Sequence, residues 1–265
     1  MSDFKELSRS VKGLTVLVTG AASGMGQATA RVFAAEGANV AVTDVSAEGT
    51  QAVADEITAN GGKARAWTLD VANRDDIVSV VNDVAAHFGG LDIIVNNAGI
   101  SVRVAIDDEA YEDAWAKAIA VMLTAHPRII RAALPHLRKS KSPRIVNIAS
   151  TEALGATALH SPYSAAKGGV AGLTRSLAPG CGQLGIRVNA ICPGYVDTPM
   201  NALIFGSDVF RDAFARDHAT GLQTPEEIAA LVVFLASDEA SSLTGAVLSC
   251  DRGWTAFKRP AAIAG

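Results

Sequence analysis

Three glycines stand directly behind the first apolar run of the chain, and they restrict the possible fold more than any other feature. The run Leu14–Thr19 is followed by Gly20, Gly24 and Gly26 within the segment TGAASGMG, and a helical pattern begins at once. Glycines at this spacing allow a tight turn and let backbone N–H groups approach a pyrophosphate at a helix N-terminus. A glycine after a strand is often only a turn, but a strand, three glycines and a helix in this order favour nucleotide binding.

The rest of the chain alternates short apolar runs with helical patterns, which is typical of a parallel sheet covered on both faces. We expect strands at 14–19, 39–44, 64–69, 91–96, 144–149, 187–191 and 246–250, and helices near 24–37, 47–60, 74–88, 108–138, 162–178 and 225–236. The predicted class is α/β, a single-domain Rossmann fold whose doubly wound parallel sheet has about seven strands flanked by helices. Residues 1–265 form one domain in this prediction, because no linker or internal repeat appears.

Prolines and a capping motif predict where three helices start, open or end. Thr224, followed by proline and then by Glu227 at the third helical position, predicts a capped helix start. Pro127 lies inside the longest predicted helix and interrupts its hydrogen bonding. Pro179, which is followed by a glycine, is expected to end the helix that begins near residue 162 early.

An acidic residue ends the second predicted strand and bears on the choice of dinucleotide. Asp44 lies 24 residues beyond Gly20, where a carboxylate can accept both hydroxyls of an adenosine ribose. It would also repel a 2′-phosphate by about 4 kcal/mol per unit charge at close range. No Arg or Lys at 21–23 or at 45 offsets that repulsion. Unless Asp44 is only a solvated loop acid, the cofactor is NAD rather than NADP.

Composition and charge limit the partners of the chain. With 49% hydrophobic residues and a formal net charge of −4, the chain has ample material for a core but no electrostatic footprint for nucleic acid. No run approaches the ~20 apolar residues of a membrane span. Cys181, Cys192 and Cys250 have no metal or redox spacing. We therefore expect a soluble cytoplasmic protein with no metal, no membrane partner and no nucleic-acid partner.

A tyrosine and a lysine four residues apart form a candidate acid–base pair. Ser161 and Pro162 predict a helix start, as an N-cap and a first helical residue, so Tyr163 and Lys167 would share one helix face. A phenol that acts as a base near neutrality needs its pKa lowered by roughly three units, or about 4 kcal/mol. An ammonium about 4 Å away, at an effective dielectric of about 20, supplies that much. The alternative is an ordinary helix with a buried Tyr ring and a solvated Lys.

Three further motifs complete a recognisable order along the chain. Asn96-Asn97-Ala98-Gly99 follows the fourth predicted strand, Ser150 lies 13 residues before Tyr163, and Pro193-Gly194-Tyr195-Val196-Asp197-Thr198 follows the sixth strand. Together with TGAASGMG and YSAAK, these motifs resemble those of the short-chain dehydrogenase/reductase family. The resemblance extends from residue 14 to about residue 254, nearly the full length.

The resemblance implies a set of cofactor contacts. Asp70 and Val71 would contact the adenine, and the Val196 backbone and the Thr198 hydroxyl would hold the nicotinamide carboxamide. The full implied set is Gly20, Ser23, Gly24, Met25, Gly26, Asp44, Asp70, Val71, Asn97, Ala98, Gly99, Tyr163, Lys167, Pro193, Gly194, Val196 and Thr198.

For catalysis the resemblance implies hydride transfer between nicotinamide and a carbinol or carbonyl carbon. Tyr163 would take the hydroxyl proton, Lys167 would lower the pKa of Tyr163 and bind the nicotinamide ribose, and Ser150 would hold the substrate oxygen. No step requires a metal. Residues 14–100 would form mainly the cofactor-binding half, and 144–254 the catalytic and substrate half.

One position departs from the family pattern. Where relatives have an asparagine in a VNL-like segment, this chain has Met122, whose thioether is a poor hydrogen-bond partner. In the family that position helps to hold a water in the proton path behind the lysine, partly through a carbonyl freed by a helix kink. We hypothesise that Pro127, which has no N–H for the Leu123 carbonyl, opens the helix so that a carbonyl at 122 or 123 keeps the water. The alternative is that Met122 only packs and turnover is slow or lost.

The substrate site is less well defined by sequence. Apolar residues within 200–221 predict a short helical lid over the nicotinamide, although core packing explains any single one of them equally well. Arg103, Glu152 and His160 are expected at the surface, and an inward-facing Arg103 would favour an anionic or polar substrate. The tail from Trp254 onward would dock on a neighbouring subunit or fray.

The predicted function is an NAD-dependent oxidoreductase that acts on a small secondary alcohol or ketone, with Tyr163 as acid/base. One alternative is a 3-oxoacyl-thioester reductase, against which the NAD preference of Asp44 counts. The other is a dinucleotide-binding regulatory or scaffold protein whose catalysis is impaired by Met122, against which the intact Ser150 and Lys167 count. The resemblance also implies a homo-oligomer, a tetramer or a dimer.

Overall fold

The computed structural model describes residues 7–256, and its centre is a parallel sheet of seven strands. The strands are β1 (Thr15–Thr19), β2 (Asn39–Asp44), β3 (Lys63–Thr68), β4 (Ile93–Asn96), β5 (Arg144–Ile148), β6 (Arg187–Pro193) and β7 (Val247–Cys250). They lie in the order β3-β2-β1-β4-β5-β6-β7, and every neighbouring pair is parallel. Most of the strands are buried on both faces, which explains their nearly continuous apolar runs.

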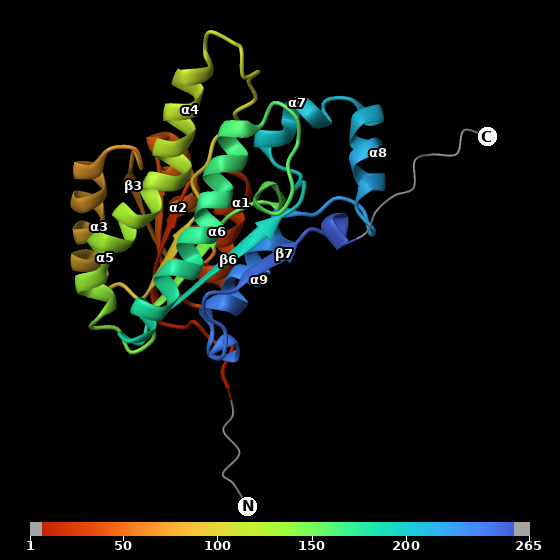
Figure 1. Ribbon diagram of the computed structural model, residues 1–265. Helices are drawn as coiled ribbons and strands as arrows, with labels where there is room; N and C mark the ends of the chain where they lie inside the picture. The colour runs from red at the N-terminus through yellow and green to blue at the C-terminus, as the bar shows by residue number, and fades with distance from the viewer. Residues whose placement is uncertain (1–6, 257–265) are drawn as a thin grey trace, which may run out of the picture.

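Helices cover both faces of this sheet (Figure 1). One layer holds α1 (Gly24–Ala35), α2 (Ala47–Ala59) and α9 (Pro225–Ala236), and the other holds α3 (Arg74–Phe88), α4 (Tyr111–Ile119), α5 (Ala125–Leu137) and α6 (Ser161–Gly182). In these layers α1 packs against α9, and α3 packs against α5. The short helices α7 (Ala202–Phe205) and α8 (Asp208–Asp217) follow β6. This arrangement confirms the predicted doubly wound α/β class.

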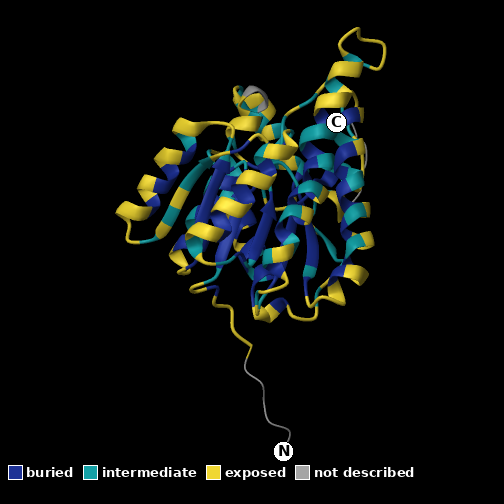
Figure 2. Cartoon of the chain, turned by 90° about the vertical axis from the view of Figure 1, so that its left-hand side faces the viewer, coloured by how far each residue is buried: buried dark blue, intermediate teal, exposed yellow. Residues whose placement is uncertain are grey.

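Apolar side chains fill the space on both sides of the sheet. Successive strand residues face opposite sides, so Val16 and Val18 pack with Phe33 of α1, whereas Leu17 packs with Ile129 of α5. Figure 2 shows the buried strands in dark blue beneath helices whose outer faces are exposed. Within residues 7–256 no helix combines the length and the apolar character that a membrane span needs.

The strand order reverses between β1 and β4, and this places the candidate site. β2 and β3 lie on one side of β1, whereas β4 to β7 lie on the other. In a doubly wound sheet, ligands bind in the crevice at the carboxyl ends of the strands where the order reverses. Gly20 follows β1 at this point, Asn97 follows β4, and Asp44 ends β2 next to them.

The helix that carries Tyr163 is longer than the sequence predicts. α6 runs through Pro179 to its end at Gly182, so the prediction that this proline ends the helix early is wrong. A proline removes one helical hydrogen bond and crowds one carbonyl, but Pro179 is exposed and the buried Cys181 anchors the last turn on the core. At the other end Ser161 is the first helical residue rather than the cap, one position from its predicted role.

The long helix expected over 108–138 is divided. Its two α-helical parts are joined by a π-helical turn, η1 (Ala120–Thr124), in which the Ala125 N–H donates to the Ala120 carbonyl five residues back. A π turn inserts one extra residue into the helix and redirects the side chains on either side of it. The helix therefore departs from regular α geometry just before Pro127, in the region where the sequence predicts that it opens.

Other local expectations agree with the structure. β2, α3 and α9 have the predicted bounds. The capping box at the start of α9 is present, and the Thr224 N–H donates to Oε2 of Glu227 at 2.8 Å. The segment predicted as a helical lid contains the 3₁₀ turn η3 (Pro199–Asn201), α7 and α8.

Candidate active site

Two of the three glycines in the first loop are required by close backbone contacts. Gly20 has a φ of +65°, and a Cβ added there would lie 2.8 Å from the Ala98 Cα. At Gly26, which has an ordinary φ, a Cβ would lie 2.1 Å from the Gly20 carbonyl oxygen. No side chain tolerates such separations, so the loop, the start of α1 and the β4 loop approach one another only because these positions lack a Cβ.

An asparagine fastens the β4 loop to the glycine loop. The Asn97 Nδ2 donates to the Thr19 carbonyl at 2.8 Å and to the Gly20 carbonyl at 3.1 Å. The Thr19 hydroxyl in turn accepts the N–H groups of Asn97 and Ala98, both at 3.0 Å. These four hydrogen bonds hold both loops in one position at the carboxyl edge of the sheet.

The amino end of α1 has the features of an anion site. Ser23 occupies the N-cap position in an extended conformation, but its side chain makes no capping hydrogen bond, and the first turn, which includes Gly24 and Met25, has no acidic residue. The N–H groups of that turn and the positive end of the helix dipole favour a negative group. The first turn of α1 therefore fits the pyrophosphate of a dinucleotide.

Two carboxylates lie at the ends of neighbouring strands on the adenosine side. The half-buried Asp44 accepts backbone N–H groups with both oxygens, one of them from Ala22 in the glycine loop at 3.3 Å. Asp70 follows β3, accepts the Ala72 N–H at 2.9 Å and precedes the buried Val71. The glycine loop, Asp44 and this pair together fit an adenosine dinucleotide.

The segment after β6 closes the opposite side of the crevice. Pro193 ends β6, and Gly194 is packed so closely that a Cβ there would lie 2.7 Å from the His218 ring. The buried Val196 already uses its carbonyl, which accepts the Asn201 Nδ2 at 2.8 Å. The Thr198 side chain lies against the first turn of α1, so this segment and the glycine loop face each other.

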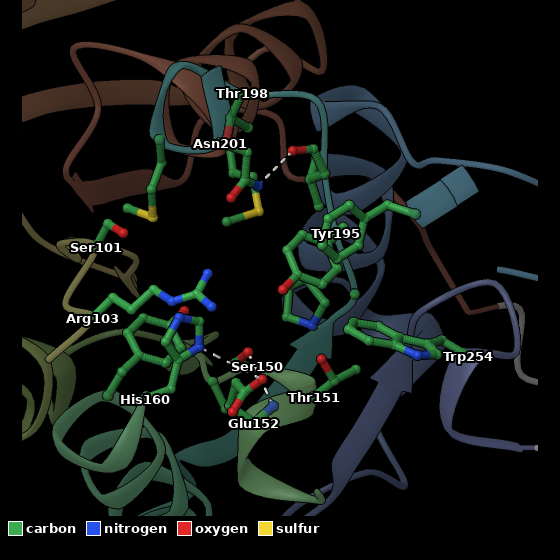
Figure 3. A pocket seen from close by; sticks show the side chains of 18 of the residues that line it. Ser101, Arg103, Ser150, Thr151, Glu152, His160, Tyr195, Thr198, Asn201 and Trp254 are labelled. Carbon is green, nitrogen blue, oxygen red and sulfur yellow. Dashed lines mark hydrogen bonds and ion pairs between the residues drawn. The ribbon is translucent and has the colours of Figure 1, made fainter. Parts of the chain in front are cut away.

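A cavity of about 640 Å³ opens between these segments (Figure 3). Ser150, at the end of β5, and Tyr163, in the first turn of α6, line it together. Met25 and Thr198 from the predicted cofactor side line the same cavity. The structure thus brings the two predicted catalytic hydroxyls to one space beside the predicted dinucleotide crevice.

The phenol of Tyr163 is a weaker acid than the sequence argument requires. Burial and the nearby Glu152 carboxylate raise the pKa of Tyr163 to about 12, although a hydrogen bond with Ser150 acts in the opposite direction. The pKa is thus raised rather than lowered as the sequence argument expects, because desolvation of the phenolate outweighs the hydrogen bond with Ser150.

Lys167 is held beneath the cavity rather than in it. The side chain is almost fully buried, and its Nζ donates to the Ile148 carbonyl at 2.8 Å. Nζ lies 5.7 Å from the centre of the Tyr163 ring. Burial lowers the pKa of the ammonium to about 8. The amine also lies close to Gly99 of the β4 loop, which keeps it at the dinucleotide crevice.

Glu152 and His160 are inside the cavity wall, so the prediction that they lie at the surface is wrong. Glu152 accepts hydrogen bonds from the Thr157 N–H at 2.9 Å and from the Ser164 hydroxyl at 2.8 Å. These bonds, together with the charge of a nearby His160, hold the pKa of the carboxyl below its ordinary value against the effect of burial. Burial and the neighbouring Arg103 lower the pKa of His160.

Arg103 reaches into the cavity from the loop after β4 (Figure 3). The residue is exposed, as expected, yet its guanidinium lies close enough to His160 to contribute to the lowering of the pKa of that ring, and it opposes the rise in the pKa of Tyr195 that burial causes. No salt bridge within residues 7–256 involves Arg103. The cavity therefore contains a positive group that is available to a substrate.

Aromatic rings form the far wall, and one of them, Trp254, was not predicted to be part of the site. Tyr195 packs against Trp254 at 4.9 Å and against Phe214 of α8 at 4.3 Å between ring centres. All three line the cavity. Trp254 thus belongs to the site of its own chain and not to a docking tail, and the remainder of that predicted tail, from Phe257, lies outside the described residues. Trp254 follows β7 in a segment without a periodic apolar pattern, so nothing in the sequence indicated that its ring lines the cavity.

Met122 lies behind the catalytic residues. It is fully buried in η1 and packs with Ala118, Ala166 and Tyr163. Its sulfur approaches Gly99, near the Lys167 amine. The Met122 thioether therefore lies where the family resemblance places the side-chain amide of an asparagine. Within residues 7–256, no group of three His, Cys, Asp or Glu side chains is arranged to hold a metal ion.

Comparison with known proteins identifies the family. The profile of the family described as enoyl-(acyl carrier protein) reductase matches residues 20–255. A cis-4-hydroxycyclohexanecarboxylate dehydrogenase from Sinomonas cyclohexanicum is 44% identical over 240 residues, which is 91% of this chain and 96% of that protein. A 3-oxoacyl-(acyl-carrier-protein) reductase FabG from Thermotoga maritima is 36% identical over 243 residues, covering 92% of this chain and 98% of the relative.

A solved structure agrees with these matches. A dehydrogenase/reductase from Sinorhizobium meliloti 1021 has a TM-score of 0.87 and 38% sequence identity, and the match covers 93% of this chain and 97% of that one. The chain therefore belongs to the short-chain dehydrogenase/reductase family, whose members are oxidoreductases that use a nicotinamide dinucleotide. This confirms the resemblance drawn from the motifs.

Proposed function

We propose that the protein is an NAD-dependent dehydrogenase that interconverts a small secondary alcohol and its ketone. The observation that carries this proposal is that Ser150 and Tyr163 line one cavity beside the glycine loop. In this proposal the cofactor contacts are those that the family resemblance implies, with the pyrophosphate at the first turn of α1 and the adenosine ribose at Asp44.

Tyr163 acts as the acid and base in the proposed reaction. The chemistry supplied by bound NAD is acceptance of a hydride from the carbinol carbon, or its return in the reverse direction. Ser150 donates a hydrogen bond to the substrate oxygen, and Tyr163 exchanges a proton with that oxygen. Because the pKa of Tyr163 is about 12 in the protein alone, its activation depends on positive charge brought beside the phenol, from Lys167 and the oxidised cofactor.

NAD is favoured over NADP by charge. The Asp44 carboxylate lies beside Ala22, and neither Ala22 nor the exposed Val45 carries a positive charge. A 2′-phosphate placed there would meet a carboxylate with no neighbouring cation in the loop. The electrostatic cost of that contact is on the order of several kcal/mol.

We further propose that the substrate carries a carboxylate. Arg103 lies in the same cavity as Ser150 and Tyr163, and no side chain within residues 7–256 forms a salt bridge with it. A guanidinium binds a carboxylate in a bidentate fashion. Glu152, the other charge in the cavity wall, is already engaged by Thr157 and Ser164. The relative named for 4-hydroxycyclohexanecarboxylate has a substrate of this chemistry.

Two substrates that differ only in the carboxylate test this proposal. NADH formation is followed at saturating NAD with cis-4-hydroxycyclohexanecarboxylate and with cyclohexanol, for the unaltered protein and for Arg103→Ala. We expect turnover of both, a lower KM for the acid, and a roughly tenfold to hundredfold rise of that KM in the variant, because a charged hydrogen bond contributes about 1.5–3 kcal/mol. Equal KM effects on both alcohols would remove Arg103 from substrate recognition.

The same assay separates the alternatives. A 3-oxoacyl-thioester reductase would use NADPH to reduce an acetoacetyl thioester and would leave both alcohols unreacted. Because the chain is similar to FabG, an acetoacetyl thioester with NADPH is included in the assay. A regulatory or scaffold protein would bind NAD and turn over none of these substrates.

In the proposed assignment the protein is a soluble cytoplasmic homo-oligomer, a tetramer or a dimer, and 200–221 closes over the cavity as a lid.

A further inference from the structure

A buried histidine lies in the first turn of α5, close to the catalytic lysine. His126 is only 2% exposed, and neither nitrogen of its imidazole ring has a hydrogen-bond partner within residues 7–256. Burial and the charge of Lys167 lower the pKa of His126 to about 3, so the ring is neutral near pH 7. A neutral imidazole has one donor and one acceptor nitrogen, and here both are unused.

A second unused polar atom lies on the same side of the sheet. Asn96 donates through Nδ2 to the Asn147 Oδ1 at 2.9 Å, but its own Oδ1 is buried with no partner among the described residues. Asn96 is two residues beyond Ile94, which packs with Ile129 in the core between the sheet and α5. Since strand residues two apart share a face, the Asn96 amide points toward the α5 layer, where His126 is buried.

Leaving these atoms unpaired is energetically costly. A buried donor or acceptor without a partner loses the hydrogen bonds that it makes with water in the unfolded chain and gains none in return. A buried water typically makes about three hydrogen bonds to such groups. Met122 in η1 and His126 in the first turn of α5 are both buried. His126 is therefore a buried polar side chain only four residues from the position where the family asparagine is missing.

We propose that His126, together with the Asn96 carbonyl oxygen, holds a buried water against the Lys167 ammonium and so replaces the amide that Met122 does not provide. His126 is a positioning residue in this assignment, because it acts on the reaction only through Lys167. The Lys167 ammonium donates one hydrogen bond to the Ile148 carbonyl, and the water accepts a second one. This inference rests on the proposed dehydrogenase function, because Lys167 matters only if Tyr163 transfers a proton.

The charged and titratable groups around His126 are few. Lys167 on α6 is the group whose charge acts on the ring, and from the sheet Asn96 and Asn147 are neutral amides. Cys192 on β6 acts on Lys167. Loss of the water would therefore be felt at Lys167 and Tyr163, and it would appear as a shift in the pH dependence of turnover rather than as a loss of substrate binding.

Variants at 126 test the proposal through a readout that a merely structural role would not move. We expect His126→Leu to lower kcat tenfold to hundredfold with an unchanged KM for NAD and to move the pH profile of kcat toward higher pH. His126→Gln, which keeps a donor and an acceptor, should retain at least a third of kcat. Adding Met122→Asn to His126→Leu should restore most of the lost rate, because the amide would again face the water.

A matched control comes from the same helix. His136 hydrogen-bonds Asn82 at 2.9 Å on the outer part of α5, so His136→Leu removes an imidazole without touching the site and should leave kcat and the pH profile unchanged. Equal losses in His126→Leu and His126→Gln, with no rescue by Met122→Asn, would overturn the proposal. So would His126→Leu with an unaltered pH profile.

A structural readout keeps the inference separate from the proposed function. A crystal structure at a resolution that defines ordered waters should contain a water within hydrogen-bond distance of a His126 ring nitrogen and of the Lys167 Nζ, and this water should be missing in His126→Leu. A dry contact between the imidazole and apolar side chains would overturn the inference even if the enzyme is active. Absence of turnover with every alcohol, with the water present, would instead overturn the proposed function alone.

Discussion

The two sides of the crevice are built by different means. At β1 and β4, backbone lies directly against backbone: Gly20 and Gly26 have no room for a Cβ, and Asn97 ties the two loops together. Around the cavity, side chains define the space instead: the charged Glu152 and Arg103 and the aromatic rings of the far wall. The cofactor side is therefore specified by shape, which allows few substitutions, whereas the substrate side is specified by the chemistry of its side chains, which substitutions can change.

The largest effect should come from the side that is specified by shape. Gly26→Ala places a Cβ 2.1 Å from the Gly20 carbonyl oxygen, so the loop and α1 must separate. We expect NAD binding to become undetectable by calorimetry and the melting temperature to fall. Gly180→Ala on α6, where a Cβ meets nothing within 4 Å, is the matched control and should bind NAD normally. Normal NAD binding by Gly26→Ala would contradict the account of the loop.

The next largest effect lies beneath the site, in the acid stability of the protein. The pKa of His126 is about 3 in the folded state and about 6.5 in an unfolded chain. Between these values the unfolded chain binds the extra proton, so this contribution to stability is complete above about pH 6.5 and is lost as the pH falls toward 3. The loss amounts to as much as about 5 kcal/mol.

Urea unfolding measures this contribution. The free energy of unfolding should fall more steeply between about pH 7 and about pH 4.5 in the unaltered protein than in His126→Gln, which has no titrating group there. His136→Gln on the outer part of the same helix should keep the steep dependence. Parallel curves for the unaltered protein and His126→Gln would show that the ring is accessible to solvent.

A smaller effect is expected at the one cofactor contact that depends on charge. Asp44→Ala removes the predicted partner of the ribose hydroxyls and the repulsion of a 2′-phosphate. We expect the Kd for NAD to rise roughly tenfold to hundredfold, since hydrogen bonds to a charged group contribute about 1.5–3 kcal/mol, and the Kd for NADP to fall. If the ratio of the two dissociation constants does not change, Asp44 is only a loop acid.

The sequence predicts the side that is specified by shape because its constraints are local. Where a loop residue packs directly against backbone, as Gly20 does, only glycine fits, so the same glycine occurs in any sequence that makes this turn. The capping box at Thr224 and the strand at 39–44 are likewise determined by residues that are neighbours in the sequence. These features were therefore predictable with their bounds, and the family resemblance follows from their order.

The substrate side could not be predicted in the same way. Whether Glu152 or His160 faces inward depends on how the loop between β5 and α6 folds back on itself, and no periodic pattern encodes that fold. The prediction from Pro179 failed for a related reason, because the loss of one helical hydrogen bond was outweighed by the burial of Cys181, two residues further along the chain. The pKa of Tyr163 was misjudged because the cost of burying a phenolate is invisible in the spacing of two residues.

The most direct test of the account is the rate of NADH formation by Tyr163→Phe, with NAD affinity measured in parallel. The account predicts that kcat with cis-4-hydroxycyclohexanecarboxylate falls by about 10²–10⁴-fold, the usual contribution of a general acid–base group, while the Kd for NAD changes less than about threefold. A variant that keeps more than about a tenth of the unaltered kcat would contradict the claim that this phenol carries the proton.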